Sequence, residues 1–304
     1  MRALGWVAGR TVGSVRHMAD RVLRTIIDGL AFGEGPRWHD GRLFVSDMHG
    51  AQVLAIDDAG ASAVVARVAN QPSGLGWLPD GRMLVVSMTD RRVLRMEADG
   101  SLVEHADLSG LAPWHCNDMT VDGRGNAYVG NFGWDLIDRT TPHRRTNVIL
   151  VRADGSFSEV AGDLNFPNGM VVTPDGDTLV VGESGAGCLT SFRIAADGSL
   201  HDRRLWATLP QGSAPDGICL DAAGAIWSAC PMTGTVWRIA DGGEILDQVH
   251  LPEGEKAYAC TLGGAERRTL FICASSSHMP DECRARRDAR VVAVEVEVAG
   301  AGWP

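Results

Sequence analysis

Phe166-Pro-Asn-Gly-Met-Val-Val-Thr-Pro-Asp-Gly176, followed by Asp177-Thr-Leu-Val-Val-Gly-Glu183, is the stretch that decides the fold. A short β-branched run leads into a Pro-Asp-Gly turn, and a second β-branched run follows it. Proline fixes the φ angle that the second position of a turn needs, and glycine supplies the positive φ that closes it. The pattern predicts a β-hairpin, with the amide of Asn168 just before its first strand.

The same pattern recurs and divides the chain into six segments of similar length. Each segment reads as strand, tight turn, strand, loop, strand, Asp-Gly-type turn and strand, which is the four-stranded blade of a β-propeller. The residues that open the six segments are Glu34, Ser73, Asn117, Asn168, Asp216 and, for the sixth, a residue at about Cys260.

The ends of the chain indicate how the ring closes. One strand is missing from the last segment, and a spare strand, Thr25–Phe32, precedes the first. We therefore expect an all-β, six-bladed β-propeller closed by its N-terminal strand, because closure removes free sheet edges. It would form a single domain over residues 25–304. Residues 1–24 are expected to be a leader, either flexible or a short helix, with Met18 an alternative start.

Two stretches depart from the repeat, and both are long loops of the kind that usually serves a function or is disordered. Asn131–Thr146 is an insertion in the third blade and is expected to overhang the mouth of the ring. Ser275–Ala289 is a charge-rich insertion in the sixth blade and is expected to be partly solvated.

Charge and cysteine content exclude several classes of partner. The formal net charge is 28 − 38 = −10, whereas nucleic acids and anionic membranes require a basic face. The seven cysteines are an odd number without a Cys-x-x-Cys pair, which favours buried free thiols in a reducing compartment. We expect a cytoplasmic monomer or homodimer that binds no nucleic acid and no membrane.

The residues that open the blades would meet at one end of the propeller axis. Two carboxylates and two amides confined there would be unfavourable without a cation among them. Oxygen ligands without His or Cys suit Ca²⁺ best, with Mg²⁺ and Mn²⁺ as alternatives and Zn²⁺ less suited. The structural alternative is that Asn-Gly and Asp-Gly are ordinary turn residues, which accounts for one such position better than for four in register.

Four motifs resemble the signature of the gluconolactonase / regucalcin (senescence marker protein) family: Gly33-Glu-Gly-Pro36, Asn117-Asp118, Phe166-Pro-Asn-Gly169 and Pro215-Asp-Gly217. The resemblance covers about residues 25–298 and implies a six-bladed propeller that hydrolyses a lactone or a related ester. It implies a divalent cation held by Glu34, Asn168 and Asp216, with Asn117 near the metal or on the substrate.

The chemistry expected of these residues is hydrolysis by an activated water. A cation polarises the carbonyl group and lowers the pKa of a bound water. Asp216 is the candidate base that takes the proton of the water, since Glu34 would be the tighter structural ligand. Asn117 is the candidate neutral donor that holds the carbonyl oxygen or the water.

The expected substrate pocket departs from that of sugar lactonases. Regucalcin-like members carry an arginine two residues before Asn117, where this chain has His115. Histidine with Met119, Phe132 and Trp134 offers fewer donors and more apolar area than arginine does. We therefore expect a small-molecule lactone or ester that is less hydroxylated than an aldonolactone.

Two alternatives to a lactonase stay open on the sequence alone. A phosphotriesterase-type hydrolase would use the same cation on a P=O bond, and metal ligands do not specify the substrate. A non-catalytic calcium-binding propeller would need none of the four polar positions for its fold, and their retention counts against it.

Overall fold

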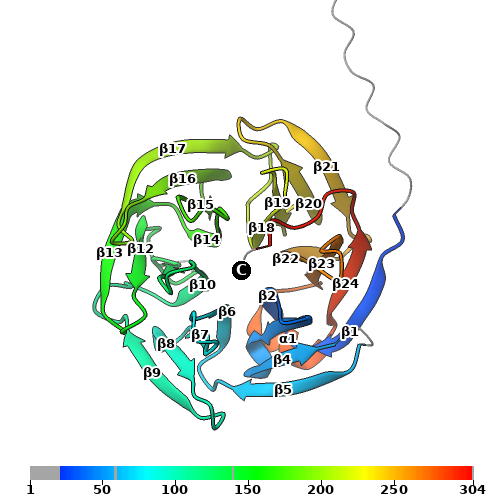
Figure 1. The fold of residues 1–304 in the computed structure, drawn as a ribbon. Helices are drawn as coiled ribbons and strands as arrows, with labels where there is room; N and C mark the ends of the chain where they lie inside the picture. The colour runs from blue at the N-terminus through cyan, green and yellow to red at the C-terminus, as the bar shows by residue number, and fades with distance from the viewer. Residues whose placement is uncertain (1–20, 58–59, 139, 303–304) are drawn as a thin grey trace, which may run out of the picture.

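The computed structural model describes residues 21–57, 60–138 and 140–302. Six four-stranded antiparallel sheets stand around a central axis like the blades of a propeller (Figure 1). The prediction of a six-bladed β-propeller is confirmed. Residues 1–20 of the predicted leader lie outside the described residues.

The first three blades follow one another in the sequence, each running from an inner to an outer strand. The first contains β2 (Gly33–His39), β3 (Arg42–Asp47), β4 (Gln52–Ile56) and β5 (Ser62–Arg67). The second contains β6 (Pro72–Trp77), β7 (Met83–Ser87), β8 (Arg92–Met96) and β9 (Leu102–Asp107). The third contains β10 (Cys116–Val121), β11 (Ala127–Asn131), β12 (Thr146–Val151) and β13 (Phe157–Leu164).

The other three blades continue the same order, and the last is completed from the N-terminus. The fourth contains β14 (Pro167–Val172), β15 (Thr178–Glu183), β16 (Cys188–Ile194) and β17 (Leu200–Thr208). The fifth contains β18 (Ile218–Leu220), β19 (Ile226–Cys230), β20 (Thr235–Ile239) and β21 (Ile245–His250). The sixth contains β22 (Lys256–Gly263), β23 (Thr269–Ser275), β24 (Ala289–Glu295) and β1 (Arg24–Leu30).

Strand β1 closes the ring, as the sequence predicts. It pairs antiparallel with β24, with Thr25 opposite Val292 and Leu30 opposite Ala289. The outer edge of the sixth blade is thus covered by the N-terminal end of the described chain. Segments more than 250 residues apart in the sequence are joined in one sheet, which ties the two ends of the ring together.

The Pro-Asp-Gly turn of the fourth blade shows why the repeat forms hairpins. Gly176 has φ +75° and its N–H donates to the carbonyl of Thr173 at 2.8 Å. The Asp175 carboxylate accepts hydrogen bonds from the Asp177 N–H at 3.0 Å and from the Thr173 hydroxyl at 2.6 Å. Only glycine takes this φ without strain, and the aspartate satisfies the backbone of the turn.

The hydrophobic core lies mainly in layers between neighbouring blades. Between the first and sixth blades, Leu43 and Val45 pack with Val291, and the ring of Trp38 stacks on Phe271 with centroids 5.6 Å apart. Each fully buried side chain of this size contributes roughly 1.5–3 kcal/mol to folding. These layers fix the inner strands relative to one another and so position the residues on the axis.

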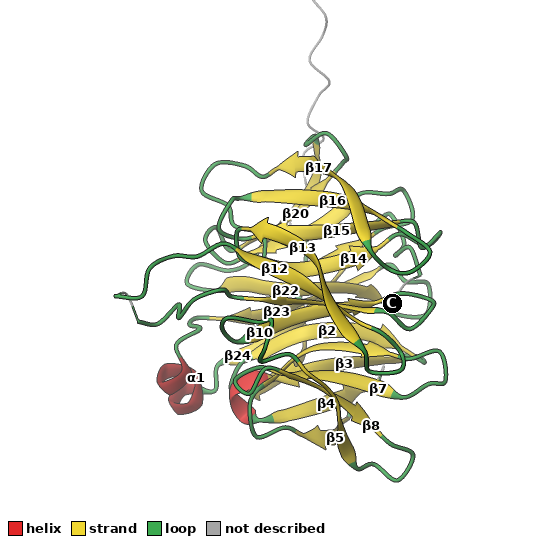
Figure 2. Ribbon diagram, turned by 90° about the vertical axis from the view of Figure 1, so that its left-hand side faces the viewer, coloured by secondary structure: helices red, strands yellow, loops and turns green. Residues whose placement is uncertain are grey.

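The two faces of the ring differ. Strand direction alternates within each blade, so the β11–β12 and β23–β24 connections lie on the face where the inner strands begin. The second of these connections contains the short helix α1 (Pro280–Arg286), which contacts the 3-10 helix η1 (Met48–Gly50). Figures 1 and 2 place the C-terminal end of the described chain, where the Ala301 N–H donates to the carbonyl of Leu220 at the end of β18, on the opposite face from α1.

Candidate functional site

In five of the six blades a bulge lies near the start of the inner strand, whereas in the fifth blade Asp216 directly precedes a regularly paired strand, β18. The pairing register between the first two strands shifts between Glu34 and Arg37 in the first blade and between Pro167 and Met170 in the fourth. Equivalent shifts occur in the second, third and sixth blades. Bulges change the direction of the side chains that they contain, and they often lie next to active sites.

Glycines allow the chain at the start of neighbouring inner strands to approach closely. A Cβ atom on Gly169 would lie 2.5 Å from the backbone nitrogen of Ile218, and closer still to the carbonyl oxygen of Asp216. The Gly169 N–H instead donates to this carbonyl at 3.2 Å, and the Gly217 N–H donates to the carbonyl of Tyr258 at 2.8 Å. The Asn-Gly and Asp-Gly pairs therefore do more than form turns, because they bring the backbones of adjacent blades into contact.

Hydrogen bonds connect the predicted site residues of four blades. The Asn117 side-chain amide donates to Asn168 Oδ1 at 2.8 Å, and the Asn168 amide donates to Ser184 Oγ at 3.1 Å. Ser184 Oγ in turn donates to the carbonyl of Pro215 at 2.6 Å, directly before Asp216. At the other end, Ser73 Oγ lies 3.5 Å from Asn117 Oδ1. The two asparagines are thus buried, in contact, and held in fixed orientations.

Glu34 and Asp216 stand beside Asn117 and Asn168, and these four residues are called the ring below. The negative charges of the two carboxylates are unfavourable there. Burial, the charge of Asp216 and the charge of Asp118 raise the pKa of Glu34 well above its usual value. Burial and the charge of Asp118 raise the pKa of Asp216 to about 8, against hydrogen bonds from the Asn168 side chain and the Gly217 N–H. Asp216 therefore holds its proton near neutral pH unless a positive charge enters the site, and the same two causes, burial and neighbouring negative charge, favour the protonated form of Glu34.

A buried ion pair lies next to these carboxylates. Arg37 Nη2 is 2.8 Å from Asp118 Oδ1 and also donates to the carbonyl of Met119 at 2.5 Å. The charge of Arg37 lowers the pKa of Glu34 less than burial and the charges of Asp216 and Asp118 raise it. The pair of Arg37 and Asp118 therefore fixes the first blade to the third without neutralising Glu34 and Asp216.

The donor set fits a hard divalent cation. Glu34, Asn117 and Asn168 are 5–6% exposed, and Asp216 is partly exposed. Two carboxylates and two amides in one ring supply only oxygen ligands, which Ca²⁺ prefers. Among the described residues, no group of three or more His, Cys, Asp or Glu side chains is placed to hold an ion, so any ion in the ring would depend on the amide oxygens as well.

Aromatic residues of the third and fourth blades form a continuous wall beside the ring. The His115 ring stacks on Trp114 at 4.8 Å and lies 6.4 Å from Phe132. Phe132 packs edge-on against Phe166 at 4.9 Å, and Trp134 packs against the same ring at 5.8 Å. The structure thus brings His115, Phe132 and Trp134 together, through Phe166, which sequence reasoning did not assign to the pocket.

Two sequence-based placements were wrong. Met119 is fully buried, and its terminal methyl group lies against Gly76 of the second blade, so it belongs to the core and not to the rim of the pocket. The sixth blade contributes Tyr258 at the ring position, whereas Cys260 lies deeper, with its Sγ 3.8 Å from that of Cys219. All seven cysteines lie within the described residues and are free thiols, as predicted.

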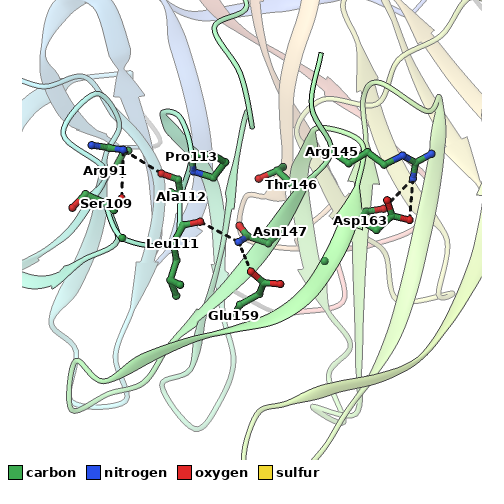
Figure 3. A pocket seen from close by; sticks show the side chains of 12 residues that line it. Arg91, Ser109, Leu111, Ala112, Pro113, Arg145, Thr146, Asn147, Glu159 and Asp163 are labelled. Atoms are coloured by element: carbon green, nitrogen blue, oxygen red, sulfur yellow. Dashed lines mark hydrogen bonds and ion pairs between the residues drawn. The ribbon is translucent and has the colours of Figure 1, made fainter. Parts of the chain in front are cut away.

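A hollow lies away from the ring, between the second and third blades (Figure 3). It has a volume of about 390 Å³. Polar side chains that line it already form hydrogen bonds within the protein. Arg91 donates to the carbonyl of Ala112 at 3.2 Å, and Asn147 donates to Glu159 at 2.7 Å. This hollow contains none of the predicted site residues, and we place the functional site at the ring.

No helix of the described chain is long and apolar enough to span a membrane.

Comparison with known proteins gives one family. The model of the SMP-30/Gluconolactonase/LRE-like region matches residues 32–276. Two similar proteins are 6-deoxy-6-sulfogluconolactonase of Pseudomonas putida, 26% identical over 82% of this chain and 85% of that protein, and pentonolactonase XacC of Haloferax volcanii, 28% identical over 83% and 84%. The solved structure of a gluconolactonase from Xanthomonas campestris is 26% identical and covers 91% of this chain and 90% of its own, with a TM-score of 0.72.

Proposed function

The chain belongs to the SMP-30/Gluconolactonase/LRE-like family, and on this premise we propose that it is a metal-dependent hydrolase that opens a lactone or a related carboxylic ester. Two relatives that align over more than four-fifths of the chain are named as lactonases. The observation that carries the proposal is the ring itself, in which two carboxylates with raised pKa values and two buried amides converge without a compensating charge.

The ion that we assign to the ring is Ca²⁺, with Mg²⁺, Mn²⁺ and Zn²⁺ as the ions to be compared. Glu34, Asn168 and Asp216 would hold it, and Asn117 would lie next to it. When bound, such an ion supplies Lewis-acid polarisation of the carbonyl group and lowers the pKa of water. The free thiols support a reducing compartment, and we propose that the enzyme acts in the cytoplasm.

The residues of the chain would divide the hydrolysis between them. Asp216 takes a proton from the water that attacks the carbonyl carbon, and this proton passes to the ring oxygen when the acyl C–O bond breaks. Asn117 donates a hydrogen bond from its side-chain amide to the carbonyl oxygen, where negative charge develops. The product is a hydroxy acid, in which all atoms of the lactone and the water are retained.

The aromatic wall supports a lactone with few hydroxyl groups. His115 has its pKa lowered by burial, so it is neutral near pH 7 and offers one N–H donor. Phe132, Phe166 and Trp134 present apolar area, against which the hydroxyl groups of a sugar lactone would find no hydrogen-bond partner. We propose that alkyl γ- or δ-lactones are turned over better than gluconolactone.

The test is a reloading experiment with a substrate panel. The protein is stripped with a chelator, reloaded with one ion at a time, and assayed on gluconolactone, alkyl lactones, an aryl ester and a phosphotriester. We expect lactone hydrolysis that is lost in Asn168→Ala and Asp216→Ala and kept in Asp154→Ala, since Asp154 occupies an exposed Asp-Gly turn. Absence of hydrolysis with every ion would contradict the proposal, and preference for the phosphotriester would reassign the substrate.

A further inference from the structure

Tyr258 is the member of the ring that the sixth blade contributes. Its carbonyl accepts the hydrogen bond from the Gly217 N–H, just as the carbonyl of Asp216 accepts that from Gly169. The residue lies in the bulge of β22, between the register positions of Ala257 and Ala259. Tyr258 therefore stands at the position that Asp216 and Asn168 hold in their own blades.

The phenol of Tyr258 is a buried donor without an acceptor. The residue is 4% exposed, and its hydroxyl has no hydrogen-bond partner among the residues that the structure describes. The aromatic side chain of Tyr258 is held edge-on against Phe32, with the two ring centroids 4.7 Å apart. Buried hydroxyl groups are nearly always paired, and leaving one unpaired costs free energy. An acceptor supplied by a bound molecule would resolve this.

The surroundings of the phenol point toward the ring. Burial and the charges of Asp216, Cys283 and Glu34 raise the pKa of Tyr258, in that order of influence. Both ring carboxylates thus lie within electrostatic reach of the hydroxyl. The phenol keeps its proton throughout the neutral range, so it can donate a hydrogen bond but is not a base.

The sixth blade faces the third across the axis, as Figure 1 shows for β22 and β10. Tyr258 and Asn117 therefore come from inner strands on opposite sides of the axis. The carbonyl carbon of a lactone carries two oxygens, the carbonyl oxygen and the ring oxygen. Two donors on opposite sides can address one oxygen each.

We propose that the Tyr258 hydroxyl donates a hydrogen bond to the ring oxygen of the bound lactone while Asn117 serves the carbonyl oxygen. The inference rests on the proposed lactonase function. When water adds and the acyl C–O bond breaks, the electron pair of that bond goes to the ring oxygen, and its proton comes from Asp216. Tyr258 keeps its own proton and stabilises the charge that develops on the leaving oxygen.

The two tyrosines of the chain provide a matched pair of variants. Tyr258→Phe keeps the aromatic side chain that packs on Phe32 and removes only the hydroxyl. Tyr128→Phe removes a hydroxyl that is equally buried but donates to the carbonyl of Gly198 at 3.0 Å, away from the ring. The substrates are an alkyl δ-lactone, which has a poor alkoxide leaving group, and p-nitrophenyl acetate, which has a good one.

The expected result is a selective loss. Tyr258→Phe lowers kcat/KM for the δ-lactone by roughly 10²-fold, the effect of removing one donor to a developing oxyanion, and changes p-nitrophenyl acetate hydrolysis far less. Its Tm does not fall, because the hydroxyl that is removed has no partner among the described residues of the free protein, and its calcium affinity stays that of the parent. Tyr128→Phe shows the reverse, with full activity and a lowered Tm, because the Gly198 carbonyl loses its buried donor.

Three outcomes would overturn the inference. Unchanged δ-lactone hydrolysis in Tyr258→Phe removes the role altogether. An equal loss on both substrates shows that the phenol does not act on the leaving oxygen, and a matching loss of calcium affinity shows that it supports the ion site instead. Absence of lactone hydrolysis in the parent is a separate result, which overturns the proposed function first and this inference with it.

Discussion

Ion binding at neutral pH should release protons from the ring. With a pKa of about 8 in the ion-free protein, Asp216 is about nine-tenths protonated at pH 7. Glu34 also has a pKa raised well above its usual value. Because a carboxyl group must lose its proton to bind Ca²⁺, we expect about one proton to be released from Asp216 per ion at pH 7, and any proton held by Glu34 adds to this number.

The same linkage sets the pH dependence of affinity. Each proton released strengthens ion binding about tenfold for every unit of pH, which is about 1.4 kcal/mol. Calcium affinity should therefore rise at least about tenfold between pH 6 and pH 7, from the proton of Asp216 alone. The free energy of unfolding of the ion-free protein should fall as pH rises toward about 8, because the folded state then binds more protons than the unfolded state does.

Isothermal titration calorimetry in buffers of different ionisation enthalpy measures the number of protons directly. The slope of the observed enthalpy against the buffer ionisation enthalpy is that number. Asp216→Asn should reduce it by about one, whereas Asp154→Asn should leave it unchanged, since Asp154 lies in an exposed turn. A slope of zero for the parent protein would refute the reasoning, because it would mean that the ring is already ionised or does not take the ion.

Three further results are expected. Arg37→Ala leaves a buried carboxylate unpaired and should lower the free energy of unfolding by about 3–5 kcal/mol in urea denaturation; a change below about 1 kcal/mol would show a pair that behaves like a surface one. Gly169→Ala forces a Cβ atom against the carbonyl of Asp216 and should weaken calcium binding in calorimetry, whereas Gly110→Ala, whose added Cβ would meet no atom within 4 Å, should not; equal affinities would argue against the close approach. Removing residues 1–30 exposes the edge of the sixth blade and should abolish a single cooperative thermal transition in calorimetry; retention of one sharp transition would show that ring closure is dispensable.

The repeat and its turns carry enough information in the sequence to predict the fold. Pro-Asp-Gly and Asp-Gly turns act over a few residues, so each hairpin can be predicted locally, and the spare N-terminal strand follows from counting strands. The convergence of Asn117 and Asn168 was predictable for the same reason, because equivalent positions of a propeller meet at its axis. Helix α1 was missed, since a charge-rich stretch of seven residues gives only a weak helical signal.

What the sequence could not give depends on bulges and on contacts between distant segments. The bulge of β10 falls between Cys116 and Met119 and adds a residue, so the alternation of buried and pocket-facing side chains shifts and Met119 points into the core. The pair of Arg37 with Asp118 joins residues 81 positions apart. Neither residue carries a local signal of that contact.

The sixth ring position shows the same limit. The five other positions are marked by a polar residue, mostly followed by glycine or preceded by proline, whereas Tyr258 reads as an ordinary strand aromatic. Only the register of β22 against β23 reveals that it occupies the bulge. The mistaken choice of Cys260 followed from treating the strand as regular.

The central claim is that residues from separate blades hold one cation on the axis, and a crystal structure grown with Mn²⁺ tests it most directly by anomalous scattering. We expect a single strong peak within roughly 2.6 Å of side-chain oxygens of Glu34, Asn168 and Asp216. A peak elsewhere, or no peak on the axis at a pH above 8, would contradict it.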